Sequence, residues 1–285
     1  MQTLRDIRRR IRSVESTRQI ARAMEMVSAA RLKRAQARLL SARPYAESME
    51  GVVRKVCSAG EGVSHPFVSK RDVEAVAVCV IASDRGLCGA FNANVIRQAE
   101  EFAAQQGDVH VRFVPVGKKA AQHFGRREKG LKPCFPELGP FAEPAITKAL
   151  TAELTRLYLE GEVQEVWMDF THFISSGSRR VVLERLLPVE LEGGEGTSED
   201  YGYIYEPSAD MLLGTLLPRY VEMKVFVRIA ESCASEHSAR MVAMSFATKN
   251  ADDMIFDLTL LRNRARQSAI TKEIADIVGT AEVLR

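Results

Sequence analysis

Both ends of the chain carry apolar residues at the seven-residue spacing of a coiled coil. Towards the C-terminus, two positions of this repeat are occupied by Tyr220, Val227, Ala234, Met241, Thr248 and Ile255, and by Met223, Ala230, His237, Met244, Ala251, Leu258 and Ala265. A similar stripe near the N-terminus comprises Leu4, Ile7, Ile11, Val14, Ala21, Met24, Ser28, Leu32 and Ala35. Because a repeat of about 3.5 residues keeps one face of a helix turned towards a neighbour, both ends are predicted to be long paired helices.

The simplest partner for each stripe is the other one, packed antiparallel, with the middle of the chain forming a head. The first helix is expected over residues 2 to about 56, with a kink or shift at Pro44. The last is expected from about Ser208 to near the end, with Pro218 in its first turns. We therefore predict three segments: a coiled-coil helix over 1–57, an α/β head over 58–206 and a second coiled-coil helix over 207–285.

The charge of the chain is unevenly distributed. The net charge is +3 over 285 residues, but residues 1–55 carry 14 Lys and Arg against 5 Asp and Glu. A basic arm of this kind is typical of proteins that bind nucleic acid, an acidic membrane surface or an acidic protein partner. Aromatic residues that could stack on bases are missing among its arginines, which disfavours nucleic acid. No apolar run approaches the roughly 20 residues of a membrane span.

The cysteines and histidines do not form a metal-binding pattern. Cys57, Cys79, Cys88, Cys134 and Cys233 are widely spaced, no CxxC occurs, and no pair of histidines lies three or four residues apart. Free thiols in a reducing compartment are the default expectation for such an odd, scattered set. We predict no metal site and no cofactor.

The middle of the chain alternates between strand and helix patterns. Strands are predicted over 73–82, 109–116, 163–173 and 180–189, and helices over about 92–106, 118–127 and 145–160. The first strand is almost wholly apolar, as expected for a strand that is buried on both faces. This alternation indicates an open, mostly parallel sheet.

One loop stands where such sheets usually bind ligands. Ser83–Asn92 (SDRGLCGAFN) follows the first strand, and the crevice beyond the carboxyl ends of parallel strands is the common ligand site. Asp84 could serve as a nucleophile or metal ligand, but the loop matches neither GxGxxG nor GxxxxGK[ST]. Asn92 could instead cap the next helix. A structural loop, a protein-contact loop and a catalytic loop all remain open.

Other polar residues yield no catalytic constellation. Ser175, Ser176 and Ser178 are typical of a hairpin turn, and His172 is expected to be an ordinary hydrogen-bonded strand residue. His237 occupies a seam position, where a polar group more often fixes register than performs chemistry. The arginines at 262, 264 and 266 offer forked donors to acidic groups, or they form a solvated face.

Three long stretches are distinctive: IARAMEMVSAA at 20–30, the loop at 83–92, and the last helix with SEHSARMVAMSFATKNADD at 235–253 and NRARQSAITKEI at 263–274. In these stretches the chain resembles the gamma subunit family of rotary F-type ATP synthases. The resemblance implies a Rossmann-like open-sheet α/β head inserted between two terminal helices that form an antiparallel coiled coil. One departure is Gly279-Thr280-Ala281-Glu282, at the tip of the last helix.

The resemblance also implies partners and contact residues. The coiled coil would stand inside a ring of three alpha and three beta subunits, and the head would rest on the membrane c-ring beside epsilon. Tyr205 and Glu206 match the foot on the c-ring. Residues that match beta-subunit contacts are Met24, Arg85, Cys88, Arg266, Gln267, Thr271 and Glu273.

In this reading the chain is a non-catalytic rotor with no cofactor and no nucleic-acid partner. It would associate peripherally with a bacterial inner membrane on the cytoplasmic side, because the matching region begins at residue 1. The alternatives are a free-standing α/β nucleotide-binding enzyme with helical extensions, and a basic coiled-coil protein that binds nucleic acid.

Overall fold

The computed structural model describes residues 3–59, 65–127, 135, 137–190, 206 and 208–283. The chain divides into two compact units. Unit 1 comprises Met1–Ser28 and Arg240–Arg285, and unit 2 comprises Ala29–Ala239. The three segments expected from the sequence are a different division, made along the chain, and they stay a prediction.

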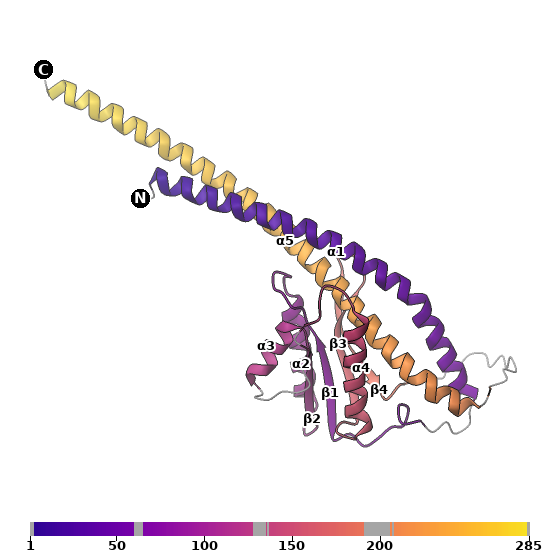
Figure 1. Cartoon of the computed structure of the whole chain (residues 1–285). Coiled ribbons are helices and arrows are strands. Elements are labelled where there is room, and N and C mark those ends of the chain that lie inside the picture. The colour runs from indigo at the N-terminus through magenta and orange to yellow at the C-terminus, as the bar shows by residue number, and fades with distance from the viewer. Residues whose placement is uncertain are drawn as a thin grey trace. The chain divides into compact units, whose positions relative to one another are not determined.

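Two long helices run in opposite directions and each contributes to both units (Figure 1). Helix α1 spans Leu4–Ala59 and continues through Pro44. Helix α5 spans Ala209–Val283 and continues through Pro218. At about 1.5 Å per residue, the 75 residues of α5 extend for roughly 110 Å. The predicted α/β head between two long terminal helices is confirmed.

Unit 1 is an antiparallel helix pair that packs through the predicted seams. Ile7, Ile11 and Ala21 are buried on α1, and Met244 and Ala251 are buried on α5. A surface ion pair between Arg18 Nη1 and Asp252 Oδ1, at 2.8 Å, joins the two helices. Small residues at seam positions allow close approach of the backbones, which makes the pair thin.

Unit 2 contains a four-stranded sheet with the order β2-β1-β3-β4. Its strands are β1 (Ala75–Ile81), β2 (His110–Val116), β3 (Glu165–Phe173) and β4 (Arg179–Leu187). Strand β1 pairs in parallel with β2 and β3, whereas β4 pairs antiparallel with β3. The predicted mostly parallel sheet is therefore confirmed, and the serines at 175–178 form the expected β3–β4 hairpin.

Helices cover both faces of the sheet (Figure 1). On one face α2 (Phe91–Gln105) and α3 (Lys118–Arg127) pack on Val78 and Val80 of β1. On the other face α4 (Pro144–Leu159) packs on the opposite side of β1. Segments of α1 and α5 join this second layer through residues such as Val53 and Val221. The central strand is thereby buried on both sides, as its apolar sequence predicts.

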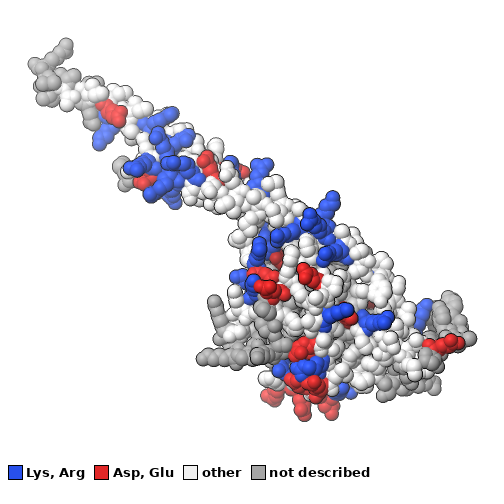
Figure 2. Space-filling view, viewed as in Figure 1, with Lys and Arg blue, Asp and Glu red and all other residues white. Residues whose placement is uncertain are grey.

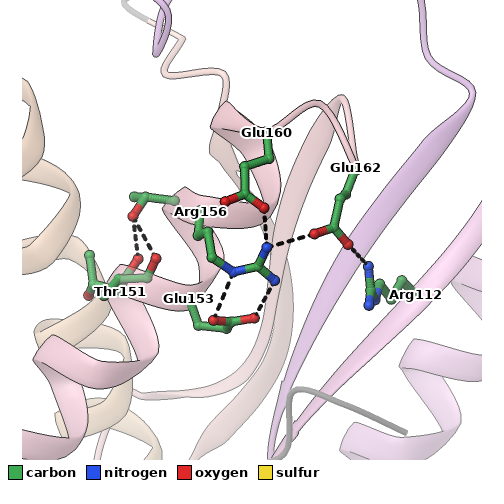
Figure 3. Close-up of polar contacts among 8 residues, drawn as sticks. Arg112, Thr151, Glu153, Arg156, Glu160 and Glu162 are labelled. Carbon is green, nitrogen blue, oxygen red and sulfur yellow. Dashed lines mark hydrogen bonds and ion pairs between the residues drawn. The ribbon is translucent and has the colours of Figure 1, made fainter.

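An ion-pair network stiffens the end of unit 2 where the parallel strands begin (Figure 3). Arg156 of α4 binds Glu153 at 2.8 Å, Glu162 at 2.7 Å and Glu160. Glu162 also pairs with Arg112 of β2, so the network joins the end of α4 to the sheet. The bond from Arg156, followed by that from Arg112, lowers the pKa of Glu162. The opposite end of the sheet, where the parallel strands finish, is left for α5.

One carboxyl group is buried under α2 with little compensation. Asp169 of β3 is fully buried, and neither of its carboxylate oxygens has a hydrogen-bond partner among the described residues. Burial raises the pKa of Asp169 from 3.8 to about 8, an effect that the nearby backbone amide of Ala99 only partly opposes. The side chain is therefore mostly protonated at neutral pH.

Replacement of Asp169 should remove a pH dependence from the stability of the chain. A raised carboxyl pKa means that the folded chain retains a proton that the unfolded chain loses. The contribution of this retained proton to the free energy of unfolding is fully present below pH 3.8 and is lost as the pH rises to about 8. We expect the free energy of unfolding of Asp169→Asn to exceed that of the wild type increasingly over this window, by about 2–5 kcal/mol at pH 8. Urea titrations at pH 5, 7 and 9 test this, and a difference that does not change with pH would contradict it.

Candidate interaction surface

Helix α5 runs across the carboxyl ends of the parallel strands, where an open α/β sheet usually has its ligand crevice. The Ser232 hydroxyl donates to the carbonyl of Ile81, the last residue of β1, at 3.5 Å. The Ser235 hydroxyl donates to the carbonyl of Thr171, near the end of β3, at 3.0 Å. The crevice between β1 and β3 is thus occupied by a helix of the same chain.

A cavity of about 250 Å³ lies elsewhere in unit 2, between α1, α5 and His172. Several of the charged groups that line it form ion pairs, some with residues outside the cavity. His172 Nδ1 lies 2.9 Å from Glu231 Oε2, and Arg228 lies 2.7 Å from Glu184. His172 is therefore the hydrogen-bonded strand residue that was predicted. Within the described ranges, no cluster of His, Cys, Asp or Glu is arranged to hold a metal ion.

The carboxylate of Asp84 fastens the Ser83–Asn92 loop to two neighbouring segments. It accepts hydrogen bonds from the backbone amides of Lys118 at 3.0 Å, Leu138 at 3.1 Å and Gly139 at 2.9 Å. Lone pairs of a carboxylate that are engaged in this way are not available to a substrate or a metal ion. Of the readings that the sequence left open for Asp84, a structural role is the one that its contacts favour.

Close backbone packing supports the same loop. Gly117, which follows β2, has φ +87°, and a Cβ atom there would lie 2.1 Å from the carbonyl oxygen of Ala82. Only glycine fits at this position, because any side chain would collide with the backbone that leads into the loop. The start of the loop is therefore held from two sides, by Asp84 and by Gly117.

The interpretation of Asn92 as a helix cap is wrong. The N-cap of α2 is Ala90, and no side chain caps it. The Asn92 side-chain oxygen instead accepts from the backbone N–H of Ser83 at 2.9 Å, and its amide donates to the Cys88 sulfur at 3.2 Å. The side chain reaches back across the loop because Ser83 has a backbone donor that needs a partner.

The two contact residues expected in this loop differ in exposure. Arg85 is exposed, whereas Cys88 is 1% exposed. Cys88 packs against Phe91, the first residue of α2, and against Ala239 of α5. The exposed apolar residue of the loop is Leu87, which is 61% exposed and has φ +63°. A left-handed backbone costs a branched residue roughly 1–2 kcal/mol, so the surrounding bonds hold this tip against strain. Leu87 was not singled out from the sequence, because its backbone conformation leaves no local signal.

The other predicted contact residues lie on the terminal helices. In unit 1, Met24 is half-buried on α1, and its carbonyl accepts a bond from Ser28. Arg266, Gln267, Thr271 and Glu273 are all exposed on α5. Glu206, in unit 2, is exposed just before α5, and Tyr205 lies outside the described residues.

Basic side chains gather on unit 1 (Figure 2). Five exposed arginines lie close together in the first turns of α1, namely Arg5, Arg8, Arg9, Arg10 and Arg12. The Arg18–Asp252 pair of the antiparallel helices sets residues 5–12 beside about 258–265 of α5, which includes Arg262 and Arg264. Arginines from both helices therefore lie at the same position along the axis of the helix pair, where acidic groups of a partner would find forked donors.

Comparison with known proteins identifies relatives along the whole chain. The model of the ATP synthase family matches residues 3–284. The ATP synthase gamma chain of Pelotomaculum thermopropionicum is 44% identical over 284 residues, and all of both chains is covered. That of Anaeromyxobacter sp. strain Fw109-5 is 45% identical over 294 residues, again with both chains covered completely.

Solved structures share the fold. A chain in the central stalk and c-ring structure of the Tetrahymena thermophila mitochondrial ATP synthase matches with a TM-score of 0.63 and 23% identity, covering 80% of this chain and 99% of that one. A chain in the OSCP/F1/c-ring structure of the Euglena gracilis enzyme matches with a TM-score of 0.69 and 17% identity, covering 99% and 94%.

Removal of the Asp84 carboxylate should destabilise the chain. Asp84→Ala leaves three backbone amides without their charged acceptor, and we expect a loss of about 2–4 kcal/mol in the free energy of unfolding. Asp84→Asn, which keeps one oxygen, should lose less. Asp72→Ala removes an exposed aspartate for which no bond is seen and serves as the matched control. Urea denaturation measures all three, and equal stability of the alanine variants would disprove the role of Asp84.

Proposed function

Because the chain belongs to the ATP synthase gamma chain family, we propose that it is the central-stalk rotor subunit of that enzyme. In this role it couples ion-driven rotation of the c-ring to ATP synthesis and hydrolysis at the beta subunits. Three alpha and three beta subunits, epsilon and the c-ring are its proposed partners. The segments 1–57, 58–206 and 207–285 are proposed as axle helix, head and second axle helix.

The observation that carries this proposal is the course of α5. In unit 2 this helix occupies the crevice of its own sheet, and in unit 1 it continues as an exposed helix paired with α1. A chain that fills its own ligand site and extends two paired helices is suited to transmit force to other subunits. No catalytic group is required of it.

The exposed surface of unit 1 supports enclosure by a partner. Ile270, Ile274 and Ile277 of α5 are 48%, 56% and 67% exposed and recur at helical spacing. Arg266 and Glu273 lie on the same face of the helix. An apolar stripe rimmed by charged residues is typical of a binding surface rather than of a free helix. We propose that this face bears on the inside of the alpha–beta ring.

The mechanism follows from the asymmetry of the helix pair. A single axle that touches three chemically identical sites in different ways gives each site its own nucleotide affinity. Rotation exchanges these affinities between the sites, and by linkage the binding and release of nucleotide drive rotation. The arginines of unit 1 are proposed to face acidic segments of the beta subunits, with Met24, Arg266, Gln267, Thr271 and Glu273 among the contacts.

The loop in the head is proposed to meet the moving lower lobes of beta. Arg85 is the exposed member of the predicted pair, whereas the buried Cys88 supports the loop from within. Tyr205 and Glu206 are proposed as the foot on the c-ring beside epsilon. The described part of the chain contains no helix that is long and apolar enough to span a membrane. We propose peripheral attachment through the c-ring to a bacterial inner membrane, on its cytoplasmic side.

A free-standing nucleotide-binding enzyme is the alternative from another class. It requires an open crevice at the ends of β1 and β3, where α5 lies. Stoichiometric binding of ATP to the isolated chain in calorimetry would favour it over the rotor. A nucleic-acid binder, the third candidate, requires steeply salt-dependent DNA affinity of the basic α1 segment.

Reconstitution tests the rotor role directly. Purified alpha and beta subunits should form a complex with this chain, and ATPase activity should rise by about tenfold or more when the chain is present, because it makes the three sites unequal. Alpha and beta mixed without the chain form the control. Equal ATP hydrolysis in both mixtures would contradict the proposed mechanism.

Reversal of charge on the axle should weaken the coupling. Arg264→Glu combined with Arg266→Glu places two acidic groups against acidic partner segments, and we expect ATPase activity of the assembled complex to fall about 3- to 10-fold. Lys70→Glu combined with Lys148→Glu makes the same change in net charge on exposed sites of the head. If both double variants lose equal activity, a specific role of the axle arginines is excluded.

A further inference from the structure

One stretch of α5 has no exposed face. Every residue from 229 to 239 is buried, in contrast to the amphipathic pattern of a surface helix. Apolar burial is non-directional, so it resists withdrawal of such a helix better than rotation of the helix about its own axis. Directional contacts, which depend on the angle as well as the distance between donor and acceptor, add a resistance to rotation that apolar burial alone does not supply.

Three serines supply such contacts on the side that faces the sheet. Ser232 and Ser235 donate to carbonyls at the ends of β1 and β3, at 3.5 and 3.0 Å. Ser238 donates to the carbonyl of Ser176 in the β3–β4 hairpin at 2.6 Å and accepts from Arg179 at 3.5 Å. The spacing of three residues keeps the hydroxyls on one side of α5 while each reaches a different part of the sheet.

These hydroxyls depart from the usual behaviour of hydroxyls within helices. Ser and Thr inside a helix commonly donate to the carbonyl four residues earlier in the same helix. In unit 1, Thr248 and Thr271 of α5 do so, to Met244 and Gln267. The three serines in unit 2 instead donate to another part of the fold, and their bonds therefore join α5 to the sheet.

A second set of contacts holds α5 from the opposite side. The Nε2–H of His237 donates to the carbonyl of Pro140 at 2.7 Å. His237 lies about 200° around the helix from Ser235 at 3.6 residues per turn. The segment that contains Pro140 also contacts α1. Arg38 of α1 donates to the carbonyl of Ala142 at 3.2 Å and stacks over Phe141.

We propose that five residues form a clamp that fixes the rotational position of the axle helices in the head, namely Arg38, Ser232, Ser235, His237 and Ser238. The clamp carries torque between the head and these helices. The proposal rests on the rotor function and assigns these five as positioning residues for it. The clamp holds α5 from two opposite sides, and it holds α1 through the segment that precedes α4. Torque applied to the head is thereby transmitted to both helices, instead of rotating one helix within the head.

Torsional stiffness in the assembled ATP synthase tests the clamp. The angular variance of a bead on the head is inversely proportional to stiffness when the rotor is stalled and the alpha–beta ring is fixed. We expect the combined variant Ser232→Ala, Ser235→Ala and Ser238→Ala to raise this variance about twofold, since each lost bond removes a directional restraint. ATP-driven ion transport into inverted vesicles, per ATP hydrolysed, should fall with it.

Matched variants separate this role from mere stability. Ser245→Ala removes an exposed serine of α5 and should leave the variance and the transport ratio at wild-type values. If the triple variant fails to assemble, Ser238→Ala alone decides, because it spares the two bonds to the strands. Unchanged variance and transport ratio in an assembled variant would overturn the clamp. Failure of the rotor function would appear separately, as a wild-type complex that does not rotate.

Discussion

The passage of α5 across the carboxyl ends of β1 and β3 is the constraint on which the rest of the fold depends. A helix in that position must satisfy the strand-end carbonyls that it covers, because buried polar groups without partners are costly. Ser232 and Ser235 meet this requirement with their hydroxyls. The same helix closes the crevice, so the architecture that serves nucleotide binding in many open sheets here serves to seat an axle.

The two parts of α5 face opposite physical demands. From 229 to 239 the helix is buried on every side and relies on polar contacts for its orientation. In unit 1 it needs only one narrow seam to α1, and residues such as Phe246 and Phe256 are 63% and 65% exposed. Such apolar exposure is costly in water and is typical of a surface that binds a partner.

Periodicity predicted much of this fold, but not its polar connections. The seam residues from Ile7 to Ala35, and from Tyr220 to Ala251, lie on the inner faces as expected, because a repeat is a local property of the sequence. The partners of Asp84 lie 34 to 55 residues away, and those of Ser235 lie 64 residues away. No spacing rule reaches so far. Asn92 was misread although its partner, Ser83, lies only nine residues away, because a cap is the more local explanation.

The sequence signal for the clamp was the SxxSxxS spacing at 232–238, which the heptad repeat in the same segment obscured. Its significance appears when the loop is considered together with α5. Ile81 accepts from Ser232, and two residues later Ser83 opens the loop that Asn92 and Asp84 hold rigid. Cys88 and Phe91 of that loop then pack on Ala239 of α5. A push on the exposed tip at Leu87 therefore reaches α5 through two short and independent routes, one polar and one apolar. In the proposed rotor, a rigid loop on a clamped helix would convert such a push into rotation of the axle, where a mobile loop would absorb it.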